Sequence, residues 1–117
     1  MKADSVNAKA SEERKAAMSA KAQLRHLAPS SARTDRIIVR LRHAANVAAT
    51  ATLTRLDGER PLDAIRYEAA KSLNVVCRLL DRGHLTQDAI EQANRAVAGW
   101  LNALLQQRHD RPTARMM

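Results

Sequence analysis

Cationic side chains recur at helical spacing between Ser31 and Leu56. Three arginines and a histidine follow one another every three or four residues, which places them on one face of a helix. They are Arg33, Arg36, Arg40 and His43, named here the arginine stripe. Because phosphates are regularly spaced along nucleic acid, guanidinium groups that repeat once per turn can each meet one and release its counterions. The arginine stripe therefore indicates binding to a polyanion.

The charge of the chain is concentrated in the same region. The 117 residues include 20 Lys and Arg against 12 Asp and Glu, a net charge of +8. Between Arg14 and His43, eight cations meet the single acid Asp35, whereas five cations and five acids cancel between Asp57 and Gly83. We therefore predict nucleic-acid-binding residues in the preceding helix as well as in the stripe. The predicted set is Arg14, Lys21, Arg25, Arg33, Arg36, Arg40, Arg42 and His43. A solvated helix face remains the alternative, although such faces usually mix signs.

A second set of polar residues repeats at helical spacing further along the chain. It comprises Tyr67, Lys71, Asn74 and Arg78, named here the Tyr67 stripe. These residue types can contact a phosphate or a base edge, and the tyrosine ring can stack on an unpaired base. The alternative is that Tyr67 packs against a neighbour and Lys71 pairs with Glu68. We favour that alternative, since one such stripe arises easily by chance on a long helix.

Residues for catalysis, metal binding or cofactor binding form no recognisable motif. The four histidines are scattered, without a second His or Cys one helical turn away. Cys77 is the only cysteine and falls near an apolar stripe, which favours an inert, half-buried thiol. Acids such as Asp63 stand where a carboxylate favours the start of a helix. We expect no enzyme, no metal site and no cofactor.

The composition predicts an all-α fold, a small antiparallel bundle of three long helices plus a weaker N-terminal helix. Aromatic residues make up only 2% and there are only three Gly and three Pro, which disfavours an all-β fold with many hairpins. Apolar periodicity predicts helices at about 11–27, 33–56, 61–82 and 87–106. The cleanest apolar seam belongs to the third of these helices. It consists of Leu62, Ile65, Ala69, Leu73, Val76 and Leu80.

The helix ends are predicted from glycine, proline and capping residues. Gly83 suits the C-terminal turn of the third helix, and Thr86 suits the cap of the fourth. The short link between them has the spacing of a helix-turn-helix, but the early acids of the fourth helix favour a plain helical hairpin. We expect a disordered N-terminal tail over 1–10, one helical domain over 11–106 and a basic C-terminal tail over 107–117.

These observations predict a small basic protein that binds DNA or RNA through phosphate contacts, as a regulator or a nucleoprotein-complex subunit. The alternative is a helical adaptor that docks on an acidic protein surface and uses its N-terminal helix as a segment that orders on binding. In that case a chain without residues 1–29 would stay folded. Attachment to an anionic membrane is disfavoured, because the N-terminal helix offers mainly alanine. We expect a cytoplasmic protein without a transmembrane segment, and a homodimer is compatible with the alanine-rich faces.

Overall fold

A computed structural model describes residues 2–32, 34–53 and 60–116, with side chains described at 11–32, 34–51 and 62–106. The four helices are α1 (Lys2–Arg25), α2 (Asp35–Leu53), α3 (Arg60–Arg82) and α4 (Gln87–Met116). These described ranges contain no β-strand. The predicted all-α class is confirmed.

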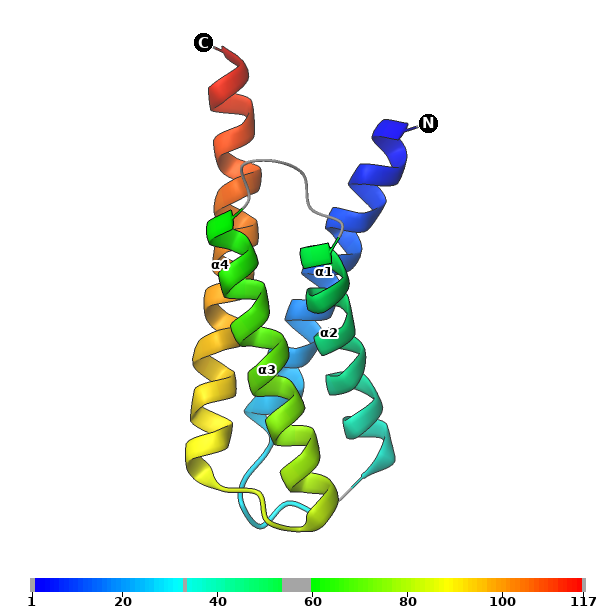
Figure 1. Ribbon diagram of the computed structural model, residues 1–117, viewed down its shortest axis with the longest axis vertical. Coiled ribbons are helices and arrows are strands. Elements are labelled where there is room, and N and C mark those ends of the chain that lie inside the picture. Colours follow the sequence, from blue (N-terminus) through cyan, green and yellow to red (C-terminus); the bar gives the residue numbers. More distant parts are fainter. Residues whose placement is uncertain (1, 33, 54–59, 117) are drawn as a thin grey trace.

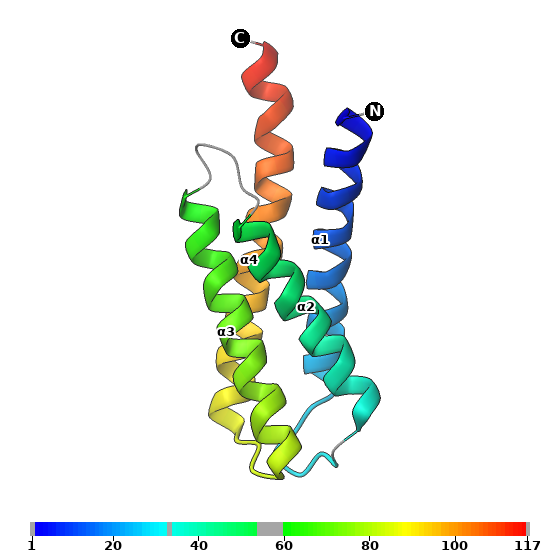
Figure 2. The ribbon, with the colours of Figure 1, turned by 45° about the vertical axis from the view of Figure 1, so that its right-hand side comes forward.

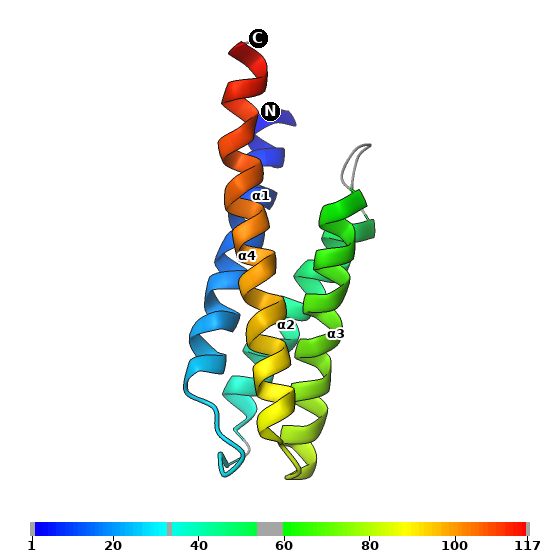
Figure 3. The same cartoon turned by 90° about the vertical axis from the view of Figure 1, so that its left-hand side faces the viewer.

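Successive helices run in opposite directions along the long axis of the molecule (Figure 1). The described helices pack as a ring in chain order, in which α1 contacts α2 and α4, and α3 also contacts α2 and α4. The two views turned from the first agree with this order (Figures 2 and 3). Each helix therefore has two neighbours, and the apolar side chains meet along the central axis.

The core is built from alanine and branched aliphatic residues, with one large aromatic ring. On α3 the predicted seam is buried at Leu62, Ala69, Leu73, Val76 and Leu80, while Ile65 is only partly buried. The helices α1 and α2 present small residues to it, which permits close packing. The alanines buried on these two helices are Ala16, Ala17, Ala20, Ala44, Ala45 and Ala48. Trp100 on α4 is fully buried and fills the largest volume.

Capping interactions end α3 and begin α4 where the sequence predicts. Gly83 has a φ of 74°, a left-handed conformation that glycine adopts without a steric penalty. Its N–H donates to the Leu80 carbonyl and the His84 N–H donates to the Leu79 carbonyl, the pair of bonds that defines a Schellman motif. The Thr86 hydroxyl accepts a bond of 3.2 Å from the Ala89 N–H and caps α4.

The outer helices are longer than the sequence predicts. α1 already begins at Lys2 instead of near Ser11, and α4 continues to Met116 instead of ending near Gln106. The segment from Lys2 to Arg25 contains no Gly or Pro to interrupt it and is rich in alanine, the best helix former. Conversely α2 begins later than predicted, at Asp35, and the predicted end of that helix at 54–56 lies outside the described residues. The division into a domain and two tails stays a prediction.

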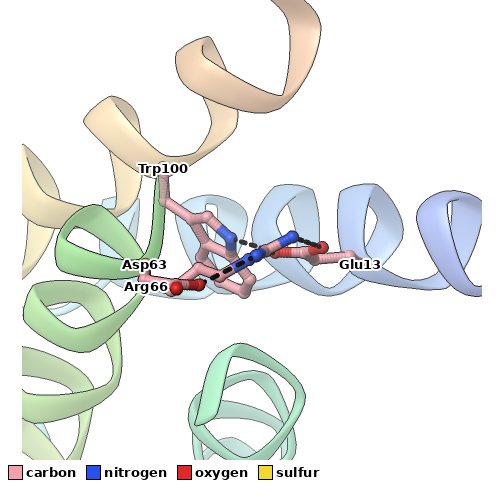
Figure 4. Close-up of polar contacts among 4 residues, drawn as sticks. All are labelled: Glu13, Asp63, Arg66 and Trp100. Carbon is pink, nitrogen blue, oxygen red and sulfur yellow. Dashed lines mark hydrogen bonds and ion pairs between the residues drawn. The ribbon is translucent and has the colours of Figure 1, made fainter. Parts of the chain in front are cut away.

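A buried polar cluster joins α1, α3 and α4 (Figure 4). The Arg66 guanidinium donates to both carboxylate oxygens of Glu13, from Nε at 2.8 Å and from Nη2 at 2.9 Å. The Trp100 indole Nε1 donates to the same carboxylate at 2.8 Å, and Arg66 Nη1 lies 3.3 Å from Asp63 Oδ1. Glu13 and Arg66 are only 5% and 6% exposed. The carboxylate thus accepts from two other helices at once.

This cluster corrects the sequence interpretation of two of its acids. A helix that begins near residue 11 would place Glu13 in its first turn, and the sequence predicts only that Asp63 favours the start of α3. Because α1 starts earlier, Glu13 lies in its interior, four residues before the buried Ala17. Asp63 does lie in the first turn of α3, but it also contacts Arg66. Arg66 in turn occupies a seam position, between Leu62 and Ala69.

Substitution Arg66→Met should destabilise the protein by about 3–5 kcal/mol, because it leaves the buried Glu13 carboxylate without its counter-ion. The double variant Glu13→Gln/Arg66→Met should lose clearly less, since the glutamine carries no charge and still offers an acceptor to Trp100. Urea denaturation followed by Trp100 fluorescence measures both. An equal loss of unfolding free energy in the single and double variants would show that the Glu13 charge does not contribute to the cost of removing Arg66.

Candidate nucleic-acid interface

The arginine stripe lies on the outside of α2 wherever its side chains are described. Arg36, Arg40 and His43 are exposed, as is the neighbouring Arg42. Arg33 lies outside the described residues. On the opposite face Ile38, Leu41, Ala45 and Ala48 are buried in the core. Packing of this apolar face is what turns the cations of α2 toward solvent.

The cations predicted on α1 lie apart from α3. Lys21 and Arg25 are exposed and Arg14 is partly buried. They belong to α1, whose backbone packs against α2 and α4 and which, among the described side chains, reaches α3 through the ion pair of Glu13 with Arg66. The structure therefore separates the predicted binding set into an α1 group and an α2 group.

The α2 cations themselves divide between two edges of the helix. Arg40 and Arg42 are two residues, or about 200°, apart around the helix axis. Arg42 lies in a hollow beside α3, and the neighbouring Ile38 carbonyl accepts a contact of 3.8 Å from the Cys77 thiol of α3. Arg40 consequently points to the other edge of α2, away from α3.

An open hollow between α2 and α3 brings together residues that the sequence analysis had placed in different sets. Its volume is about 310 Å³. It is lined by Arg42, Asn74, Cys77, Arg78, Asp81 and Arg82. Arg42 comes from the predicted binding set of α2, while Asn74 and Arg78 come from the Tyr67 stripe of α3. This hollow, named here the α2–α3 hollow, therefore unites the first and second candidate surfaces at one place.

Arg82 is the cation of this hollow that the sequence analysis missed. It follows Arg78 by one helical turn, so the spacing alone extends the Tyr67 stripe to the end of α3. Arg82 also stands in the last turn of α3, where a cation favours the helix dipole, so its place in the sequence has a second explanation. Its position beside Arg42 becomes visible only once α2 and α3 are paired.

The hollow is electropositive. Three guanidinium groups line it against the single carboxylate of Asp81. Within the described part of the chain, no ion pair or hydrogen bond engages Arg42, Arg78 or Arg82. Guanidinium groups offer five N–H donors in a planar fork that matches the oxygens of a phosphate or carboxylate. The arrangement can therefore bind an anion from two helices at once.

The other two residues of the Tyr67 stripe, Tyr67 and Lys71, lie on the surface of α3 nearer its N-terminus than the hollow. Tyr67 is 62% exposed, so its side chain lies mainly in solvent. Lys71 is also exposed, and no ion pair joins it to Glu68 among the described side chains. The stripe and the hollow form one continuous surface along α3.

No protein-family model, curated protein or solved structure matches this chain. The described residues contain no group of three or more His, Cys, Asp or Glu side chains placed to hold a metal ion. None of the helices, over the residues described, has the length and apolarity needed to cross a membrane. The geometry of the surface is accordingly the basis for the function proposed below.

Cys77 is a buried cysteine that lines the hollow. Burial raises the pKa of its thiol above the ordinary value of 9.0, and the positive charge of Arg42 lowers it in part. The thiol is therefore protonated at neutral pH, which fits the inert cysteine expected from the sequence.

The raised pKa of Cys77 predicts a loss of stability in alkali. Above pH 9.0 the unfolded chain releases the thiol proton while the folded chain retains it, so the free energy of unfolding should fall as the pH rises. Below that pH the contribution is fully present. Urea denaturation across this range should show a smaller decline in Cys77→Ala than in the unsubstituted protein. A steeper decline in Arg42→Gln would show that Arg42 supplies the opposing charge, and no change in either variant would contradict the assignment.

Proposed function

We propose that the protein binds nucleic acid through phosphate contacts centred on the α2–α3 hollow, as a regulator or a subunit of a nucleoprotein complex. The observation that carries this proposal is the cluster of three guanidinium groups from two helices, none of them engaged by another described side chain. Unengaged cations that converge on one place favour a ligand with several negative charges.

Phosphodiesters fit this surface in geometry and in charge. Each arginine can form two parallel hydrogen bonds to phosphate oxygens, and the Asn74 amide adds donors and acceptors at the same place. The net charge of +8 attracts a polyanion from a distance. Contacts of this kind give affinity with little preference for base sequence.

The remaining cations would extend the contact beyond the hollow. Arg36, Arg40 and His43 are exposed on α2, on the outer side of the helix and away from the edge that carries Arg42. A strand that occupies the hollow would have to cross the outer side of α2 to reach them, whereas Lys21 and Arg25 belong to α1 and would need a longer ligand. We therefore rank the α2 cations above those of α1 in the proposed interface.

The finer features of the fold and its setting remain proposals. An antiparallel bundle is supported by the alternating helix directions in Figure 1. The small alanine contacts of α1 support a less firmly held N-terminal helix. The hydrogen bonds of Glu13 to Arg66 and Trp100 argue against it. A homodimer, a cytoplasmic location and the absence of enzymatic activity also stay predictions, because they follow from composition and motifs alone.

Binding should depend steeply on salt and on the arginines of the hollow. A fluorescence anisotropy titration with a short labelled oligonucleotide at two salt concentrations should give a log–log slope of roughly −0.9 per phosphate contacted. Substitution Arg42→Gln/Arg78→Gln should weaken binding at low salt and reduce the slope by about two, about one for each arginine removed.

Arg95→Gln provides the matched control, because Arg95 is an exposed arginine on α4 and does not line the hollow. It should retain the slope and nearly all of the affinity. Absence of binding at low salt, or an affinity indifferent to salt, would contradict the proposal. Equal effects of the control and the hollow variant would contradict the location.

The alternative function is docking on an acidic protein surface. The same charges support it, but this function requires an N-terminal helix that becomes ordered only when the partner binds. In the structure α1 supplies Glu13 to the buried cluster and Leu24 to the core. Removal of α1 would therefore leave Arg66 without its buried carboxylate and expose Trp100.

A chain without residues 1–29 is accordingly expected to lose its cooperative unfolding transition. Circular dichroism during thermal unfolding measures this, with the full chain as the reference. A truncated chain that unfolds as cooperatively as the full chain would support the adaptor function, since α1 would then be free to serve a partner.

A further inference from the structure

We propose that the interface takes single-stranded nucleic acid, with one unpaired base stacked on the ring of Tyr67 and the neighbouring phosphates held by the α2–α3 hollow. This inference rests on the proposed function and deepens it by naming the ligand class. It begins from the unusual exposure of one aromatic ring.

Tyr67 is the aromatic residue that the fold leaves in solvent. The chain has one Tyr, one Trp and no Phe, and Trp100 is fully buried. Tyr67 is 62% exposed on the third helix, directly after the buried Arg66. An exposed ring on a rigid helix costs little entropy to present and offers a flat face on which a base can stack.

The ring lies in line with the cationic hollow. Tyr67, Asn74 and Arg78 share one side of α3, with Lys71 between them. Asn74 and Arg78 line the hollow. Arg78 follows Tyr67 by eleven residues, which is about 16 Å along the helix axis. A strand of a few nucleotides can therefore reach from the ring to the guanidinium groups without leaving this surface.

The surroundings leave the ring accessible and the stripe positive. The contact between Cys77 and Ile38 fixes the relative height of α2 and α3, which run in opposite directions. Tyr67 precedes Cys77 by ten residues, so it lies level with the part of α2 about ten residues after Ile38, where Asn46 and Ala49 are found. Both are small, uncharged and exposed. Asp63, one turn before Tyr67, is engaged by Arg66, and Glu68 lies about 100° further around the helix on the side away from α2. Among the described residues of α2 at this level, none covers the ring and none carries a negative charge.

A duplex cannot use the same ring. Its bases are stacked on one another and present only their edges, so a tyrosine fixed on a helix surface has no base face to contact. Single strands expose these faces, and stacking on an aromatic ring tolerates every base. The structure therefore predicts a preference for single strands that is added to the phosphate contacts and is insensitive to sequence.

The test compares a labelled oligothymidylate with a duplex of equal length, both at low salt. The unsubstituted protein should bind the single strand roughly tenfold more tightly. Tyr67→Ala should abolish this preference and leave duplex binding unchanged, while Tyr67→Phe should keep it, because stacking needs the ring and not the hydroxyl. Met18→Ala is the control, since Met18 is similarly exposed, at 59%, on α1.

Ultraviolet cross-linking gives a second readout that does not depend on affinity. Mass spectrometry of the cross-linked single strand should place the adduct on the α3 peptide that contains Tyr67. Equal affinities for single strand and duplex, unchanged by Tyr67→Ala, would overturn this inference while leaving the phosphate-binding function intact. An acidic polypeptide that competes as well as the oligonucleotide would overturn both.

Discussion

The buried ion pair between Glu13 and Arg66 is the interaction on which the arrangement of the helices depends. Two charges are removed from water, which is unfavourable unless their hydrogen bonds are well satisfied. Here the carboxylate accepts three such bonds, two from Arg66 and one from Trp100. These bonds require α1, α3 and α4 to stand at one relative height and rotation. Alanine-lined contacts tolerate sliding far more easily, so the polar cluster supplies a specificity that the apolar core lacks.

The same pair determines which face α3 presents to solvent. Because Arg66 points inward, the next residue, about 100° further around the helix, lies on the flank. That residue is Tyr67, and Lys71, Asn74 and Arg78 follow it at three- and four-residue steps. The orientation of the proposed interface is thus coupled to a charged contact on the inward side of the helix. A shift of α3 by one residue would bury the tyrosine and expose the arginine.

The sequence predicted the helices and the outward faces of α2 and α3, because apolar periodicity depends only on residues within one helix. Leu73, Val76 and Leu80 illustrate this, as does the Gly83 turn. The sequence did not reveal the pair of Glu13 and Arg66, since a charged residue within an apolar seam looks like a surface residue until its partner on another helix is known. The α2–α3 hollow was missed for a similar reason. Arg42 and Arg78 belong to separate periodic patterns, and only the pairing of the helices brings them together.

The burial of Glu13 also changes the charge that a ligand meets. The carboxylate of Glu13 on α1 is neutralised inside the protein by Arg66, and Asp63 contacts the same guanidinium. Two carboxylates are thereby withdrawn from competition with a bound anion at the cost of one arginine. The guanidinium groups of the hollow are not engaged by any described side chain. Because two negative charges and one positive charge are withdrawn, the rest of the chain is one charge more positive than the net charge of +8, and this difference arises from tertiary structure alone.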